Sequence, residues 1–494
     1  MITFLIGLAI LVIGGFFYGK FVERVFKPDD RQTPAVRMND GVDFVPMKKS
    51  KNALINLLNI AGTGPIFGPI QGILFGPIAF LTIPIGCVIS GATHDYLSGM
   101  ISLRQNGAQM PAIIKKYLGN GIFQVYNVFL CILMVLVGAV FTYTPGDLFA
   151  GQICGLKGTS VWTWVIYAVI LIYYLASTLL PIDKFIGKIY PFFGAVLLVS
   201  AVGVFFGIFI HGDIINNIDF SNGIGGLFNA YPYWKGIAGA SPAANFIPAF
   251  FVTVACGITS GFHSTQNTLI GRSVTHEKDG RFVFYSMMIL EGFIAMIWAA
   301  AAMGLYNSGS TAAVTGAVGE ISKTLLGPAG GIIAILGVIV LPITTGDTAL
   351  RGLRLVIADY FHNDQKKAIN RIIVTICIFI PVILILVFAK TNANGFSILW
   401  RYFAWANQTI AIFAFAVISI YLMAKKNAKK FIFLISLIPG TFYLFIISSF
   451  ICYQPIGFHL TIRISYIIAG ILAAAYFIGV IRAGKKYATK NIED

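Results

Sequence analysis

Ionisable side chains are rare within the apolar stretches of this sequence, and they are the first candidates for chemistry. His263 follows a run of glycine, serine and threonine residues, and Glu291 lies near the middle of the next apolar stretch. Ionisable groups are costly in hydrocarbon and usually mark a functional site. Histidine exchanges protons near neutral pH, and a buried carboxylate should be protonated or paired. We therefore predict that both residues carry a coupling proton, with structural hydrogen bonding as the alternative for each.

Two glycine-rich segments predict where a substrate binds. The first reads AGTGPIFGP from Ala61 to Pro69, and the second reads CGITSGFHST from Cys256 to Thr265. Glycine is a poor helix former and proline lacks an N–H donor, so a helix should break in each segment. Free N–H groups at the positive end of a helix suit a carboxylate, and kinks that only serve packing are the alternative. The predicted substrate-binding residues are Gly62, Thr63, Gly64, Ile66, Ser260, Gly261, Phe262 and His263.

Polar clusters near the ends of two other apolar stretches are candidates for a gate. Asp95 can pair with its neighbour His94 or with Arg104. A second cluster has charged residues spaced by four and then three positions, so its members share one helix face. Ordinary basic residues near the membrane, joined by a salt bridge, are the alternative for this cluster. The predicted gate residues are His94, Asp95, Asp347, Arg351 and Arg354.

The elements that position these residues are predicted to be membrane-spanning helices. Hydrophobic residues make up 57% of the 494-residue chain, and charged residues make up 11%, against about 25% in soluble domains. The apolar residues cluster into runs near the length that crosses a bilayer as a helix. We predict thirteen spans, near 2–18, 54–74, 76–100, 121–145, 161–180, 186–210, 243–271, 282–305, 327–346, 370–389, 397–423, 431–453 and 462–483.

The distribution of basic residues predicts the orientation in a bacterial inner membrane, because Lys and Arg gather in cytoplasmic loops. With the N-terminus outside and the C-terminus in the cytoplasm, thirteen spans place all basic residues at the inner ends except Lys157, Lys235, Lys323, Lys390, Arg401 and Arg463. The net charge of +16 follows from this bias and needs no nucleic-acid partner. No metal-binding spacing such as C-x-x-C occurs, and we expect no cofactor.

The spacing of the two glycine-rich segments predicts an internal repeat. They lie in the second and seventh spans, and equivalent helices five spans apart cross the membrane in opposite directions. The fold class is therefore an all-α membrane protein with a five-plus-five inverted repeat, one extra N-terminal helix and two extra C-terminal helices. The expected units are a peripheral helix at 1–20, a cytoplasmic loop at 21–52, the first repeat at 53–210, an extracytoplasmic loop at 211–242, the second repeat at 243–423, and two further helices with a basic tail at 424–494.

Six motifs follow one another along residues 20 to 425: GTGPIFGP at Gly62–Pro69, GATHDY at Gly91–Tyr96, SLR at Ser102–Arg104, CGITSGFH at Cys256–His263, DTALRGLR at Asp347–Arg354 and WANQ at Trp405–Gln408. In type and order they resemble the carbon starvation (CstA) family. That family comprises bacterial transporters of peptides or pyruvate, induced when carbon runs short, and it is grouped with the APC superfamily. The chain is shorter than the long enterobacterial members, so the motifs do not distinguish the two substrates.

The resemblance implies a secondary active transporter that imports a peptide or pyruvate by alternating access, with proton symport preferred. In sodium-coupled members of the superfamily, hydroxyl groups on the eighth core helix help to hold sodium. The matching positions here are Thr344 and Thr345, so a sodium-coupled symporter is the alternative.

Asn407 and Gln408 are interpreted mainly as scaffold. A channel needs a polar lining or a filter that the sequence does not show, and the sequence carries no hydrolase or metalloprotease motif.

Overall fold

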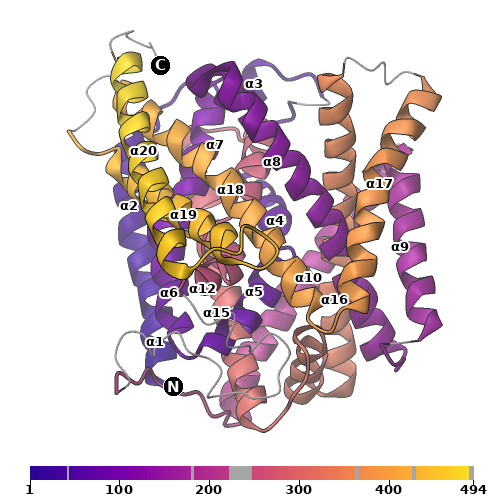
Figure 1. The fold of residues 1–494 in the computed structure, drawn as a ribbon. Coiled ribbons are helices and arrows are strands. Elements are labelled where there is room, and N and C mark those ends of the chain that lie inside the picture. The colour runs from indigo at the N-terminus through magenta and orange to yellow at the C-terminus, as the bar shows by residue number, and fades with distance from the viewer. Residues whose placement is uncertain are drawn as a thin grey trace.

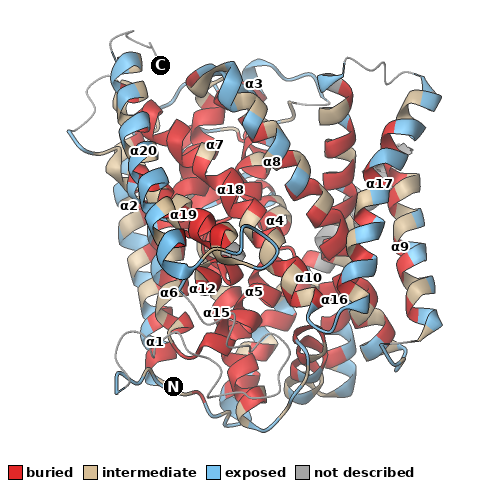
Figure 2. Ribbon diagram, in the orientation of Figure 1, coloured by how far each residue is buried: buried red, intermediate tan, exposed pale blue. Residues whose placement is uncertain are grey.

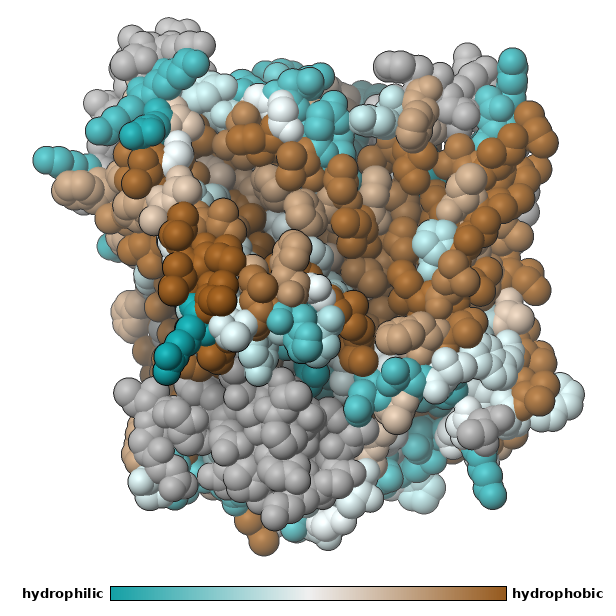
Figure 3. All heavy atoms as spheres, in the orientation of Figure 1, coloured by the Kyte–Doolittle hydropathy of each residue, from teal (hydrophilic) through white to brown (hydrophobic). Residues whose placement is uncertain are grey.

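The computed structural model describes residues 1–41, 44–158, 160–179, 183–221, 247–361, 367–425 and 430–488. Most helices run between two opposite ends of the molecule, and the N-terminus and the end of the last helix lie at opposite ends (Figure 1). Buried residues fill the middle of the bundle, and exposed ones follow its edges and loops (Figure 2). Brown apolar side chains cover much of the middle of the surface, whereas teal hydrophilic ones gather toward the two ends (Figure 3). This pattern is typical of a protein surrounded by lipid.

Nine helices of the described residues are long and apolar enough to cross a membrane. They are Ile2–Phe26, Met110–Ile153, Val161–Thr178, Glu277–Asn307, Val314–Ala358, Ile369–Thr391, Gly395–Ala424, Leu434–Tyr453 and Ile462–Ala488. The pair Lys49–Ile60 and Gly64–Phe75, which is bent by 47°, brings the number to ten if it is counted as one span. The predicted all-helical membrane fold is thus confirmed.

The count of thirteen spans stays a prediction. Helices also occupy the other three predicted spans, but they are not among the ten. They are α6 (Ala79–Gly86) joined through a π-helical turn to α7 (Ala92–Arg104), α10 (Asp183–Ile210), and the short series α12 (Ile247–Thr253), α13 (Ala255–Ile258) and α14 (Gly261–Ile270). Most of the predicted extracytoplasmic loop and the end of the basic tail lie outside the described residues.

The remaining helices complete the bundle. α1 (Ile2–Ala9) and α2 (Gly15–Phe26) form one long N-terminal helix through a π-helical turn. The others are α3 (Pro34–Arg37), α4 (Lys49–Ile60), α5 (Gly64–Gly72), α8 (Met110–Leu148), α9 (Val161–Leu179), α15 (Ser286–Asn307), α16 (Val314–Tyr360), α17 (Ala368–Thr391), α18 (Gly395–Ala424), α19 (Leu434–Tyr453) and α20 (Ile462–Ala488).

Matching kinks in α8 and α16 display the internal repeat. Gly119 interrupts α8 with φ 83° and ψ 171°, and Gly327 interrupts α16 with φ 70° and ψ 176°. Both conformations are open essentially to glycine alone. Each glycine joins a short leading helix to the long one that follows, in the fourth and ninth predicted spans. Two helices five spans apart therefore share the same unusual joint, which supports the inverted repeat.

The two broken helices lie side by side at the centre of the bundle. α4 packs against α14, and α5 packs against α13, so the pair runs antiparallel with the breaks facing one another. α18 packs on both α13 and α14, and α15 packs on α4 and α5. These neighbours position the polar groups described next.

Candidate functional site at the two helix breaks

The first break lies at the start of the predicted segment Ala61–Pro69. α4 ends at Ile60, the chain is non-helical through Thr63, and α5 begins at Gly64. The predicted break in this segment thus lies at Ala61–Thr63, and the glycine- and proline-rich stretch that follows is itself helical. Pro65 lies in the first turn of α5, where a helix needs no N–H from that residue, and Pro69 lies inside the helix.

Two of the predicted donors at this break are already used by the protein. The Ile66 N–H donates to the Thr63 carbonyl at 3.3 Å, and the Gly62 N–H donates to the Ile60 carbonyl at 2.9 Å. The Thr63 hydroxyl is buried and has no hydrogen-bond partner among the residues that the structure describes. Because an unpaired buried hydroxyl is unfavourable, Thr63 is the group at this break that a ligand can satisfy.

The second break lies at Thr259 and Ser260, where Ser260 has an extended backbone and α14 starts at Gly261. Asn407 of α18 fills it. Its side-chain oxygen accepts from the Phe262 N–H at 2.8 Å, and its amide nitrogen donates to the Ser260 hydroxyl at 2.9 Å. Phe262 and Ser260, predicted as substrate binders, thus bond to the scaffold. The sequence analysis gave Asn407 a scaffold role, and the structure shows which groups it holds.

Gly261 allows α14 to approach α18 closely. A Cβ atom at this position would lie 2.3 Å from the Asn407 carbonyl oxygen and 2.4 Å from the Ala411 nitrogen. Both neighbours are backbone atoms, which cannot rotate away. Any side chain at Gly261 would therefore force the two helices apart, so packing explains this glycine.

Four titratable side chains meet beside the breaks, and all are almost fully buried. Asp95 lies between two histidines: its Oδ2 is 2.9 Å from the His263 Nδ1, and its Oδ1 is 2.9 Å from the His94 Nδ1. The His263 Nε2 lies 3.6 Å from the Glu291 Oε2. The Ile60 carbonyl, at the end of α4, also bonds to His263. We call His94, Asp95, His263 and Glu291 the buried cluster.

The geometry assigns chemical roles within the buried cluster. If Asp95 is ionised, it accepts from the Nδ1–H of each imidazole, and the Nε2 of His263 then faces Glu291. Neither Glu291 oxygen has a hydrogen-bond partner within the described part of the chain. A proton can thus reside on the His263 Nε2 or on Glu291. Moving this proton changes which groups of the buried cluster are charged. Because buried charges must be paired, it also changes the free energy of the cluster.

The structure brings together His263 and Glu291, both predicted to carry a coupling proton, and that role stays a prediction. It adds Asp95 and His94, which were predicted as gate residues. His94 pairs with Asp95 as considered, and Arg104, the other partner considered for Asp95, pairs with Glu277 instead. The only sequence feature that pointed to these two residues was the dipeptide His94–Asp95 within an apolar stretch. Sequence alone does not reveal that a helix of the first repeat brings it against His263.

The second predicted gate cluster lies between α9 and α16. Asp347 accepts from the Ser177 hydroxyl, and the Arg351 Nη2 lies 3.4 Å from its Oδ1. Arg351 also donates to the Ser177 carbonyl at 3.1 Å. Arg354 is buried one turn further along α16. The expected pairing along one helix face is therefore present, and its role as a gate stays a prediction.

The candidate sodium residues bond within their own helix. The hydroxyls of Thr344 and Thr345 donate to the Leu341 carbonyl at 2.8 and 3.0 Å. These bonds leave lone pairs on both oxygens, so the sodium role stays a prediction. Among the described residues, no group of three or more His, Cys, Asp and Glu side chains can hold a metal ion.

Solved structures with a similar fold define the class of the protein. A manganese transporter from Eremococcus coleocola matches with a TM-score of 0.58 and 10% identity, covering 89% of this chain and 94% of the other. MhsT in complex with L-phenylalanine matches with a TM-score of 0.51 and 14% identity, covering 88% and 98%. At these identities the likeness shows the fold alone. The protein is a multi-pass membrane protein with the LeuT-type fold.

The family follows from the sequence match. Residues 1–222, 227–325 and 315–449 match the family described as carbon starvation protein CstA, and the chain belongs to this family. An uncharacterized membrane protein of Haemophilus influenzae is 40% identical over 62% of this chain and 92% of its own length. The pyruvate/proton symporter BtsT of Escherichia coli is 25% identical over 60% of this chain and 48% of its own.

A peptide transporter CstA of Helicobacter pylori is 27% identical, over 63% of this chain and 52% of its own length. The chain thus spans about half the length of the named transporters that it matches. The family recognised from the six motifs is confirmed, and so is the class of transporter rather than enzyme.

Proposed function

We propose that this protein is a proton-coupled secondary transporter that imports a small carboxylate, either a peptide or pyruvate, by alternating access when carbon is short. The observation that carries the proposal is the position of the buried cluster directly beside the two helix breaks. The buried cluster, which can bind a proton, and the N-terminus of α5 therefore lie in one site. Relatives named as a pyruvate/proton symporter and a peptide transporter support both the substrate class and the coupling ion.

The substrate carboxylate binds at the N-terminus of α5 in this proposal. The corresponding end of α14 is capped by Asn407, whereas the Thr63 hydroxyl beside α5 remains available. Glycine at positions 62 and 64 allows a ligand to approach the backbone closely, and the helix dipole favours a negative charge at this end. Of the predicted binding residues, Gly62, Thr63 and Gly64 therefore contact the substrate, and Ser260, Gly261 and Phe262 hold the second break in shape.

The coupling proton resides on His263 or Glu291. A protonated His263 imidazole lies at the end of α4, beside the first break. It adds positive charge near the place where the substrate carboxylate binds, so proton and substrate favour one another's binding. This reciprocity is what symport requires, because each ligand must raise the affinity for the other by the same factor. Loss of the proton on the inner side then weakens the hold on the substrate and favours release.

The proposed orientation places the N-terminus outside and the C-terminus in the cytoplasm. The N-terminus and the end of α20 lie at opposite ends of the bundle (Figure 1). The basic residues Lys27, Lys49, Arg104 and Lys425 belong to the same end as the end of α2, where contacts join Arg104 to Lys27 and Lys425 to Phe26. The positive-inside rule makes this the cytoplasmic end.

Uptake into proteoliposomes tests the proposal. Labelled pyruvate is compared with labelled di- and tripeptides, under a proton gradient and a sodium gradient imposed separately. We expect saturable uptake of one substrate class that an inward proton gradient stimulates. Uptake that a sodium gradient stimulates, with no effect of pH, would support the sodium-coupled alternative at Thr344 and Thr345. A non-saturating flux that follows only the substrate gradient would support a channel.

A further inference from the structure

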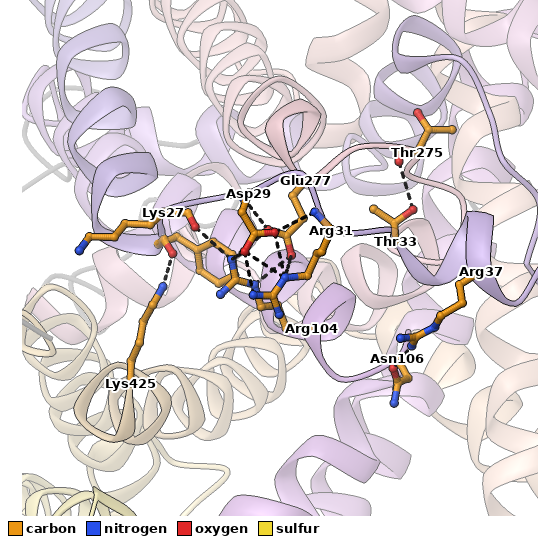
Figure 4. Close-up of polar contacts among 11 residues, drawn as sticks. Lys27, Asp29, Arg31, Thr33, Arg37, Arg104, Asn106, Thr275, Glu277 and Lys425 are labelled. Carbon is orange, nitrogen blue, oxygen red and sulfur yellow. Dashed lines mark hydrogen bonds and ion pairs between the residues drawn. The ribbon is translucent and has the colours of Figure 1, made fainter. Parts of the chain in front are cut away.

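A strap of the chain crosses the end of the bundle where α2 and α7 end (Figure 4). We define the strap as residues 27–41 and 44–47, which connect α2 to α4. It contains the short helix α3 and begins at Lys27, whose left-handed conformation (φ 56°) turns the chain out of α2. The sequence analysis treated this segment only as part of a cytoplasmic loop.

A buried ion pair lies beneath the strap. Arg104 is the last residue of α7, and Glu277 precedes α15. The Arg104 Nε lies 2.9 Å from the Glu277 Oε1, and its Nη2 lies 2.9 Å from the Oε2. Their side chains are 3% and 1% exposed. Such a two-pronged contact between guanidinium and carboxylate is both strong and geometrically specific. It joins a helix of the first repeat to a helix of the second.

The strap binds to both members of this pair. The Asp29 N–H donates to the Glu277 Oε2 at 3.0 Å, and Arg104 donates to the Lys27 carbonyl at 3.0 Å. The Arg31 Nε lies 3.8 Å from the Glu277 Oε1. Hydrogen bonds from Arg31 hold the pKa of the Asp29 carboxyl well below its usual range, so Asp29 stays ionised beside Arg104. Glu277 is thus the group on which the strap and both repeats converge.

Further contacts fasten the strap to the segment that follows α14. The Met47 N–H donates to the Ser273 carbonyl at 3.0 Å, and the Thr33 hydroxyl donates to the Thr275 carbonyl at 3.2 Å. Ser273 is also held by Asn52 of α4 through two hydrogen bonds, at 2.7 and 2.8 Å. The strap therefore clamps together the ends of α4 and α14, the two half-helices that meet at the buried cluster.

A polar seam runs beneath the strap along α4 and α14. The helices are antiparallel, with Asn52 bonded to Ser273 at one end and Ile60 beside His263 at the other. Asn56 and Asn267 occupy the positions between. Within the described residues, both amide atoms of Asn267 and the Asn56 Oδ1 are buried without hydrogen-bond partners. Parting α4 from α14 would expose these amides and open a polar route to His263.

We infer that the Arg104–Glu277 pair and the strap form the gate on this side of the transporter. The gate is shut in this structure, and its release parts α4 from α14 once in each transport cycle. The inference rests on the alternating access of the proposed function, but not on the identity of the substrate or of the coupling ion. It assigns a gating role to Glu277, which was not among the gate candidates, and to Arg104, which was considered only as a partner of Asp95.

Accessibility of the seam tests the gate. All native cysteines are replaced by alanine or serine, Asn267→Cys is introduced, and a membrane-impermeant maleimide is added to membrane vesicles of either orientation. In the parent, labelling from the strap side should be slow. Glu277→Gln should speed it by about tenfold or more, because charged hydrogen bonds are lost. Arg104→Lys keeps the charge but loses the two-pronged geometry, so it should give an intermediate rate.

The matched control removes the neighbouring ion pair. Lys278 directly follows Glu277. Its Nζ lies 2.6 Å from the Oδ1 of Asp30 in the strap, and both side chains are mostly exposed. Lys278→Gln should leave the labelling rate unchanged. Parental labelling in monodisperse Glu277→Gln and Arg104→Lys proteins would overturn the gate, and if Glu277→Gln does not fold, Arg104→Lys alone decides. Labelling requires no transported substrate. It therefore still tests the gate if the proposed substrate or coupling ion proves to be wrong.

Discussion

The two helix breaks occupy equivalent places in the two repeats, yet the protein fills them differently. At the second break, Asn407 bonds to both Phe262 and Ser260, and Gly261 presses against the backbone of α18. At the first break, the Thr63 hydroxyl has no partner among the described residues. The nearest neighbour of a Cβ atom at Gly62 would be the Phe141 ring, at an ordinary 3.6 Å.

This difference separates two tasks that one duplicated geometry can perform. The second break is a structural joint that fixes the position of His263, because Ser260 and Phe262, which precede His263, bond to Asn407 of α18. The first break keeps the Thr63 hydroxyl available for a ligand. Substitutions at the two breaks should therefore fail in different ways: the second through folding, and the first through substrate affinity.

The largest effect is expected at His263, which the second break positions. His263→Ala removes the group between Asp95 and Glu291 and leaves two carboxylates buried without their shared partner. Removing one member of a buried charged pair costs about 3–5 kcal/mol, so some loss of stability accompanies the loss of function. Proton-driven uptake in proteoliposomes should fall to the level of empty liposomes.

The exposed His276 provides the control for this substitution. His276→Ala should transport like the parent, since it removes an imidazole that lies on the surface. Wild-type uptake by a folded His263→Ala protein would show that the buried cluster does not participate in transport.

The next largest effect distinguishes the glycines of the two breaks. Gly261→Ala places a methyl group 2.3 Å from the Asn407 carbonyl, and such overpacking typically costs about 1–3 kcal/mol. Gly62→Ala meets only the Phe141 ring at van der Waals distance. Thermal unfolding of the purified proteins in detergent should show a lower midpoint for Gly261→Ala and an unchanged one for Gly62→Ala. Equal midpoints would remove the distinction between joint and binding site.

Sequence reasoning succeeded where a local pattern carries the information. Glycine with hydroxyl residues at the centre of an apolar run predicted both breaks, and their separation by five spans predicted the inverted repeat. The spacing of Asp347 and Arg351 predicted their contact, because a helix places residues four apart on one face. Each of these inferences needs only one segment of the chain and a known helix geometry.

The misses concern contacts between segments far apart in the chain. Asp95 and His263 are separated by 168 positions, and no local pattern shows that α7 brings them together. Likewise, the bond from Asn407 to Phe262 spans 145 positions. The exact position of the first break was also not predicted: it precedes both prolines, because Pro65 falls in the first turn of α5, where proline is tolerated.

A smaller effect on stability is expected at the cap of the second break. Asn407→Ala removes the acceptor of the Phe262 N–H and the partner of the Ser260 hydroxyl. Loss of a helix cap costs about 0.5–2 kcal/mol, so the midpoint of thermal unfolding should fall. Gln408→Ala is the neighbouring control: its amide donates to the Phe251 carbonyl at 2.9 Å, away from the start of α14. A drop in stability with Gln408→Ala but not with Asn407→Ala would contradict the proposed joint.

The smallest effect is the one that assigns the first break to the substrate. Thr63→Val keeps the shape of the side chain and removes a hydroxyl that bonds to no described residue of the protein, so thermal stability should be unchanged or slightly higher. If the hydroxyl donates to a substrate carboxylate, losing about 1–1.5 kcal/mol of hydrogen bonding raises KM roughly five- to tenfold. Uptake measured across substrate concentrations separates KM from the maximal rate. An unchanged KM would place the carboxylate elsewhere, and a loss of stability without a change in KM would make the first break a second structural joint.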